Sequence, residues 1–156
     1  MTAVMALFGG GFVRACSTTT TTSTNDTMKV AQTCTSMVNK ERAARGLRAV
    51  AIDSRVQTAT QQHSAFQAKY RSMTHTEPSP RQRAYERMKL AGYASGYWGE
   101  NVAAGQTTCA QVMSAWMASA GHKANILGKN YTQIGVAATK GSNNVVYWTM
   151  DLASPG

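Results

Sequence analysis

The residues GHKANIL at positions 121–127, preceded by GENV at positions 99–102, decide how this chain is interpreted. The whole chain has three histidines and seven acidic residues, and one of each, His122 and Glu100, falls inside these two short blocks. A second histidine, His75, lies upstream in a polar loop. Two imidazoles and a carboxylate are side chains that can converge on a cation or a polar substrate. We therefore predict that positions 75, 100 and 122 meet around one polar hollow.

Length and composition indicate one globular domain with a basic surface. A chain of 156 residues with 43% hydrophobic residues can bury a substantial core. The formal net charge of +9 suits anionic partners such as acidic glycans, lipid head groups or other polymers of a cell envelope. The basic residues are scattered, however, and the densest stretch, 81–89, lacks interleaved aromatic residues. We therefore expect no specific nucleic-acid binding.

The N-terminal residues are typical of an export segment. Residues 1–13 are apolar and glycine-rich, and the run is too short to span a bilayer, which takes about twenty apolar residues. It resembles the apolar region and small-residue cleavage site of a signal peptide, although no Lys or Arg precedes it. The alternative is an apolar tail. We assign residues 1–26 to this export signal-like segment and a Ser/Thr-rich linker, and residues 27–156 to the folded domain.

The three cysteines support two further predictions. Cys16 follows Val-Arg-Ala, which loosely resembles a bacterial lipobox; lipidation at Cys16 and ordinary cleavage after Ala15 both stay open. With Cys16 lipidated or removed, an exported chain is expected to pair Cys34 with Cys109, the alternative being two buried free thiols. The bridge would close a loop of roughly 75 residues and stabilise the fold by about 3–4 kcal/mol.

Hydrophobic periodicity predicts mainly helices first and a hairpin last. A helix is expected over 28–44, capped by Asp26 or Thr27 and ended by Gly46. A second is expected from Asp53 or Ser54 along an apolar stripe that ends at Tyr70. Further helices are expected over 81–91, 108–119 and 122–127, with Gly121 as the break between the last two. His63 lies on that stripe and is predicted to be a satisfied core histidine. Residues 131–139 and 145–152 predict an antiparallel hairpin around Gly-Ser-Asn-Asn. Segments 47–52 and 101–104 are expected to be extended, with a loop at 72–80 and an irregular connection at 93–98. This order indicates an α+β fold with helices packed on an antiparallel sheet.

With these blocks in order, the chain resembles the CAP superfamily of cysteine-rich secretory, antigen and pathogenesis-related proteins, in its bacterial form. The resemblance extends over residues 35–152. The matching stretches are 38–42, 46–47, 91–93, 99–101, 112–117, 121–127, 131–136 and 146–148. The family implies an α-β-α sandwich, with a central antiparallel sheet between helical layers.

The resemblance also implies a cleft with two histidines and two glutamates, in which some members bind Zn²⁺. His75, His122 and Glu100 match three of these four positions, whereas Ser119 stands where the second glutamate belongs. Asn101, Asn125 and Ser119 are predicted to support the cleft. Zinc or another divalent cation is thus a weak expectation, because the chain lacks one acid and has no His-Glu-x-x-His helix.

Two classes of function follow from these residues. The favoured one is a secreted or envelope-attached binding module, expected to be a monomer, whose partners are a divalent metal, a lipid or sterol as the family implies, or an anionic envelope polymer. The alternative is a metal-assisted hydrolase acting on peptide or cell wall. Glu100 would then be both ligand and catalytic base, and for this reason we lean against an enzyme.

Overall fold

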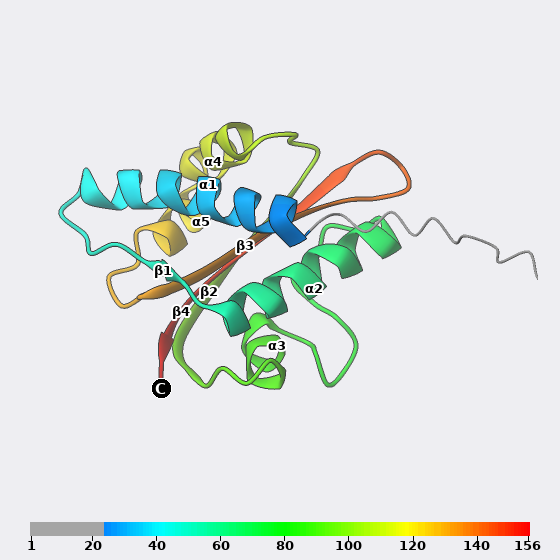
Figure 1. Ribbon diagram of the computed structural model, residues 1–156, viewed down its shortest axis with the longest axis horizontal. Coiled ribbons are helices and arrows are strands. Elements are labelled where there is room, and N and C mark those ends of the chain that lie inside the picture. The colour runs from blue at the N-terminus through cyan, green and yellow to red at the C-terminus, as the bar shows by residue number, and fades with distance from the viewer. Residues whose placement is uncertain (1–23) are drawn as a thin grey trace, which may run out of the picture.

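The computed structural model describes residues 24–156 and forms three layers. Its elements are α1 (Thr24–Ala43), β1 (Ala51–Ile52), α2 (Ser54–Tyr70), α3 (Ala84–Leu90), β2 (Ser95–Ala104), α4 (Cys109–Ala118), α5 (Ala120–Ile126), β3 (Gln133–Lys140) and β4 (Val146–Pro155). In this part of the chain one sheet, with strand order β1-β3-β4-β2, separates α1, α4 and α5 from α2 and α3 (Figure 1). The predicted α-β-α sandwich is confirmed. Only the two-residue β1 departs from the antiparallel pattern, because it pairs parallel to β3.

The N-terminal predictions fall mostly outside this description. The export segment, Cys16 and most of the linker precede residue 24. The first helix begins at Thr24, four residues before the predicted start, so Asp26 lies in its first turn instead of capping it. Gly46, with φ +67°, follows the helix as predicted, and Leu47 N donates to Arg42 O across the turn at 3.0 Å. No helix within residues 24–156 has both the length and the apolar character needed to cross a bilayer.

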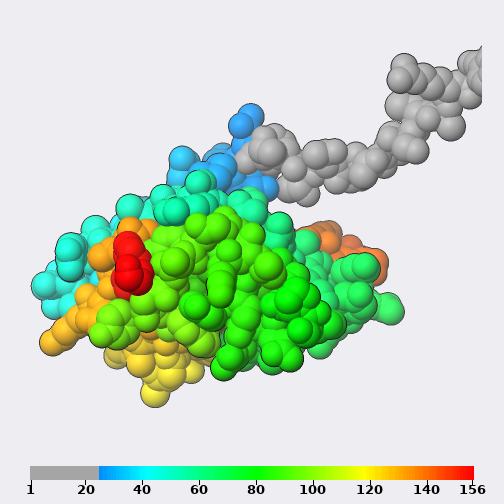
Figure 2. Space-filling model, turned by 90° about the horizontal axis from the view of Figure 1, so that it is seen from below, coloured from blue at the N-terminus to red at the C-terminus, as the bar shows by residue number. Residues whose placement is uncertain are grey.

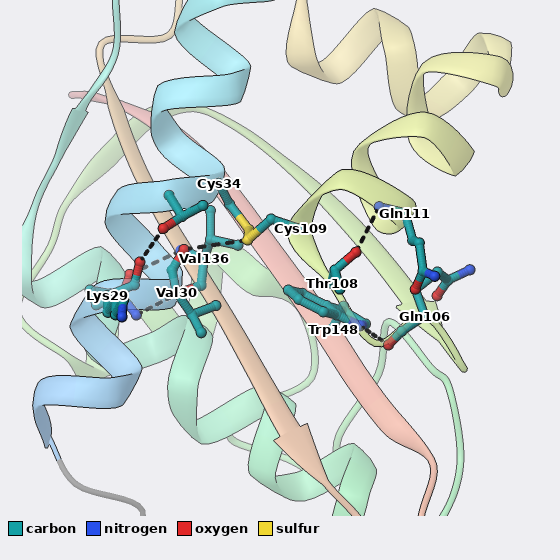
Figure 3. Close-up of a disulfide and its surroundings, with 11 residues drawn as sticks. Lys29, Val30, Cys34, Gln106, Thr108, Cys109, Gln111, Val136 and Trp148 are labelled. Carbon is teal, nitrogen blue, oxygen red and sulfur yellow. Dashed lines mark hydrogen bonds between the residues drawn. A yellow bond between two sulfur atoms is a disulfide. The ribbon is translucent and has the colours of Figure 1, made fainter.

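One face of the sheet carries the main apolar core. Alternate residues of β4, namely Trp148, Met150 and Leu152, are buried against α1 and α4. The Cys34–Cys109 disulfide joins these two helices with a Cα–Cα distance of 5.3 Å (Figure 3). The predicted bridge is confirmed, and the alternative of two free thiols is wrong.

The opposite face of the sheet is packed by polar side chains. Gln57, Thr60, Ser64 and Gln67 of α2 are all buried and bond to the sheet. For example, the Gln57 amide donates to Val136 O and accepts from Val136 N, both at 2.9 Å. It thus takes the place of the backbone of a neighbouring strand. The predicted apolar stripe of α2 is wrong at its end, because the Tyr70 side chain is exposed.

Other boundaries differ from prediction where packing overrides the local signal. Strand β2 begins at Ser95, within the stretch expected to be irregular, because it pairs with β4 over its whole length. The break between α4 and α5 lies at Ser119, which has extended backbone, and Gly121 lies inside α5. Helix α3 is shorter than predicted and starts at Ala84. The hairpin of β3 and β4 is confirmed.

A buried arginine fixes the position of α5. Arg42 of α1 is fully buried, and its guanidinium donates to the carbonyls of Ile126 at 2.8 Å and Gly128 at 2.9 Å. Its Nε also donates to Arg48 O at 2.8 Å. These bonds satisfy carbonyls at and just beyond the end of α5 that have no helical partner. The helix that carries His122 and Asn125 is thereby held against α1.

Candidate functional site

Glu100 is the centre of the site, and strand alternation decides which way it points. In β2 it pairs with Asp151 of β4, and both side chains lie on the α2 and α3 face of the sheet. Its neighbour Asn101 points to the other face, where its amide donates to His122 O at 3.0 Å. The GENV block therefore supplies one residue to each side of the sheet.

Both oxygens of the Glu100 carboxylate are occupied. Oε1 lies 2.8 Å from His75 Nδ1, and Oε2 accepts a close bond from the guanidinium of Arg87. Burial raises the pKa of Glu100, but the His75 hydrogen bond and the charge of Arg87 outweigh it, so this pKa lies below its usual value. Arg87 also donates to the carbonyl of His75 at 3.2 Å, which ties the loop to α3.

A second acid–imidazole pair lies beneath the first. His63 of α2 is fully buried, with Nδ1 2.7 Å from Glu77 Oε1 and Nε2 2.8 Å from Thr74 O. Arg81 holds the other oxygen of Glu77 at 2.8 Å. The prediction that His63 is a satisfied core histidine is confirmed. His63 thereby anchors the loop on both sides of His75.

Asp151 is a second buried acid behind Glu100. Its Oδ2 lies 2.8 Å from Thr60 Oγ1, which also lies 2.8 Å from the carbonyl of Val56. Since a hydroxyl has one hydrogen and the carbonyl can only accept, a protonated Asp151 that donates to Thr60 satisfies both contacts. Burial raises the pKa of Asp151 well above its usual value, and the negative charge of Glu100 raises it further.

The other predicted residues lie on the α5 side of strand β2. Asn125 donates to Glu100 O at 3.1 Å and to Asn101 Oδ1 at 2.8 Å, so the two asparagines link α5 to strand β2. His122 and Ser119 line a separate hollow of about 340 Å³. Among the described residues His122 makes no hydrogen bond to Glu100 or His75. Burial lowers the pKa of His122, and the charge of His75 lowers it further.

Side chains cover the outer edge of β2. The carbonyls of Trp98, Glu100 and Val102 accept bonds from Tyr131 Oη at 3.1 Å, Asn125 Nδ2 at 3.1 Å and Trp116 Nε1 at 3.2 Å. These donors block the addition of another strand. Gly99 leaves room for this contact, because a Cβ atom would meet Tyr131 Oη at 2.6 Å and displace that side chain.

A hollow of about 430 Å³ opens at the Glu100 carboxylate. It is lined by His75, Thr76, Arg83, Ala84, Trp98, Gly99, Glu100 and Asn125. The segment containing α3 and the start of β2 (green) occupies the centre of the face seen in Figure 2, beside the C-terminal residues (red). The side chain of His75 is 57% exposed, and Trp98 is 40% exposed. The hollow thus offers a ligand one aromatic side chain and several polar groups.

The donor set does not fit a zinc centre. Within residues 24–156 no group of three or more His, Cys, Asp or Glu side chains is placed to hold a metal ion. Glu100 is bonded to Arg87, whose positive charge would repel a cation. His122 lies in the neighbouring hollow. We therefore derive no step through zinc.

Sequence reasoning missed Arg87, Glu77, Asp151 and Trp98 as parts of the site. Asp151 had a detectable signal, because it is an acid inside an otherwise apolar strand. Arg87 had none, since it is one of several scattered arginines on a short helix.

Comparisons with known proteins agree with this fold. The model of the cysteine-rich secretory protein family, CAP, matches residues 35–152. The chain is 33% identical over 121 residues to the uncharacterized protein YkwD of Bacillus subtilis, covering 76% of this chain and 46% of YkwD. The chain thus spans less than half of that relative.

Two solved structures show the same fold. An extracellular protein of Bacillus anthracis containing an SCP domain has a TM-score of 0.74 and 20% identity, over 82% of this chain and 41% of that one. An outer surface protein of Borrelia burgdorferi has a TM-score of 0.73 and 18% identity, over 80% and 92%. The family match over residues 35–152 and the layered α/β fold define a CAP domain. The chain belongs to the cysteine-rich secretory protein family, in its bacterial branch.

His75 and His122 are expected to titrate in a fixed order, with the higher pKa at His75. The hydrogen bond to Glu100 raises the pKa of His75 above about 6.5, whereas burial lowers that of His122. The stabilisation from His75 is therefore fully present below about pH 6.5 and is lost as pH rises through its folded pKa. His122 has the opposite sign, and its cost to stability disappears as pH rises. NMR titration of the ring protons checks this order, with His75→Gln and His122→Gln variants assigning the signals; His122 titrating above His75 would contradict it.

Proposed function

We propose that this chain is an extracellular binding module whose hollow captures an acidic sugar unit of a cell-envelope polymer. Its disulfide supports an oxidising compartment, and the solved structures with this fold include an extracellular and an outer surface protein. The observation that carries the proposal is that Glu100 is fully occupied by Arg87 and His75. The hollow consequently presents cationic side chains to a ligand, because the charge of Glu100 is already neutralised by its partners.

Charge favours an anionic group on the ligand. The raised pKa of His75 keeps its ring more cationic near neutrality. The ring lines the hollow, and its Nδ1 bonds Glu100. Arg83 lines the same hollow, although Glu86 shares its charge at 2.9 Å. A carboxylate of the ligand can accept from both side chains.

Shape favours a sugar ring on the same ligand. Trp98 lines the hollow and is partly exposed, so it can cover an apolar ring face. Thr76 and Asn125 add a hydroxyl and an amide, which suit sugar hydroxyl groups. A catalytic function finds less support, because a hydrolase needs a free base and Glu100 is engaged. Lipid or sterol binding stays a prediction from the family.

Replacing Trp98 with alanine is expected to weaken binding of an acidic oligosaccharide about tenfold, through loss of ring contact. Calorimetry of the full chain with hexagalacturonic acid measures this, with chitohexaose as the neutral comparison. Tyr97→Ala is the matched control, because Tyr97 is 59% exposed, adjacent in sequence and does not line the hollow.

The effect of the Arg83 charge at the hollow must be distinguished from the general attraction of a basic chain for anions. Arg83→Gln should weaken binding more than Arg48→Gln, which removes the same charge from an exposed residue elsewhere. Equal losses, or equal binding of acidic and neutral saccharides, would contradict the proposal. Added Zn²⁺ should not strengthen binding, and a Zn²⁺-dependent hydrolysis lost in His122→Ala would favour the enzyme instead.

A further inference from the structure

Three of the nine methionines line one hollow between α1 and α4. The hollow has a volume of about 400 Å³ and is lined by Met37, Lys40, Glu41, Ala110, Met113, Ser114 and Met117. Met113 is 4% exposed, and the other two are partly buried against the main core. None of its lining residues is aromatic or a branched aliphatic, so its apolar residues are the three methionines and Ala110.

The disulfide explains why these methionines line the same hollow. Cys34 and Cys109 fix one turn of each helix side by side, and α1 and α4 run in the same direction from there (Figures 1 and 3). Met37 is three residues after Cys34, and Met113 is four residues after Cys109, so each lies one turn further along the same face. Met117 lies a turn beyond Met113. The covalent link therefore holds together the two helices that carry the three methionines.

We propose that this hollow binds Cu(I) through the thioether sulfurs of Met37, Met113 and Met117. Soft thioether ligands select Cu(I) over the harder divalent ions. Neutral sulfur ligands leave a single positive charge on the ion, and Glu41 lines the hollow, although Arg45 shares its charge at 2.7 Å. Lys40 is exposed, so its ammonium can stay in water beside the site.

This site is independent of the proposed saccharide hollow. It lies on the α1 and α4 side of the sheet, whereas Glu100 points to the α2 and α3 side. It contains no histidine and no free thiol, because both nearby cysteines are bridged. Failure at one hollow therefore says nothing about the other.

The test is a competition between the full chain and a chromogenic Cu(I) chelator, bicinchoninate, under anaerobic conditions with ascorbate. Every chain tested carries Cys16→Ser, because a free thiol at Cys16 would itself bind Cu(I). The chain that is wild type at the methionines is expected to withdraw one equivalent of Cu(I) from the chelator. Met37→Leu, Met113→Leu and Met117→Leu should each raise the Kd at least about tenfold, and the triple variant should not compete. Leucine preserves volume, so folding should be retained, which circular dichroism and Tm confirm.

Matched controls locate the ion. Met73→Leu removes an exposed methionine elsewhere and should leave the Kd unchanged, as should the His75→Ala/His122→Ala variant. X-ray absorption at the copper edge should show sulfur neighbours. The proposal is overturned if the wild type does not compete, if the folded triple variant competes equally, or if the two histidines prove necessary.

Discussion

Replacing Arg87 with methionine is expected to lower the free energy of unfolding by about 3–5 kcal/mol. Arg87 is fully buried and bonds Glu100, so its removal leaves a carboxylate in the interior. Its remaining partners are then the half-exposed His75 and the buried His63, whose Nε2 lies 3.7 Å from Glu100 Oε2. It also removes donors from the carbonyls of His75, Arg81 and Gln82, at 3.2 to 3.4 Å. Urea unfolding at neutral pH measures the change as a lower midpoint at constant slope.

A double variant separates the buried charge from the loss of packing. Arg87→Met/Glu100→Leu removes both ends of the ion pair and should recover a large part of the lost stability, because an apolar pair can replace a buried ion pair at little cost. Arg83→Met breaks an exposed pair with Glu86 and should change stability by no more than about 0.5 kcal/mol. If the single Arg87 variant lost less than about 1 kcal/mol, or if the double variant were no better, Arg87 would not be neutralising Glu100.

The second large effect is expected on removal of the disulfide. Cys34→Ser/Cys109→Ser should lower the free energy of unfolding by about 4 kcal/mol, because the bridge spans 75 residues and restricts the unfolded chain. The bridge also fixes α1 to α4, so the variant should lose Cu(I) affinity as well. Denaturant unfolding with and without reductant measures the stability.

Thiol counting provides the control for this prediction. In the unfolded, non-reduced full chain, alkylation should label Cys16 alone and spare Cys34 and Cys109. Cys16→Ser should leave unfolding unchanged, because the residue lies outside the domain predicted from the sequence. Two labelled cysteines within residues 24–156, or a loss below about 1 kcal/mol in the double variant, would contradict it.

The sequence alone predicted the elements whose signals are local. The periodicity of α4, the Gly46 that follows α1 and the β3–β4 hairpin were all read from neighbouring residues. The pairing of Cys34 with Cys109 followed from an odd cysteine count and expected export. The resemblance to the CAP superfamily then supplied the layer order, which no local signal contains.

The α2 helix shows where this reasoning failed. Its inward positions include Gln57, Thr60 and Gln67, which apolar periodicity counts as solvent-facing. They are buried because the sheet presents unpaired backbone and Thr149 and Asp151 to them as hydrogen-bond partners. Partners of this kind, some 80 to 90 residues away in the chain, leave no trace in the local pattern.

The sequence by itself determined the fold family, the disulfide and the candidate trio of His75, Glu100 and His122, since motif order and residue type suffice for these. Tertiary structure alone decided how these three residues are arranged. Glu100 bonds His75 and the buried Arg87, whereas His122 lies in the neighbouring hollow. The physical reason is that the charge of a site depends on which side chains meet there. That meeting depends on strand alternation and on pairing between distant segments.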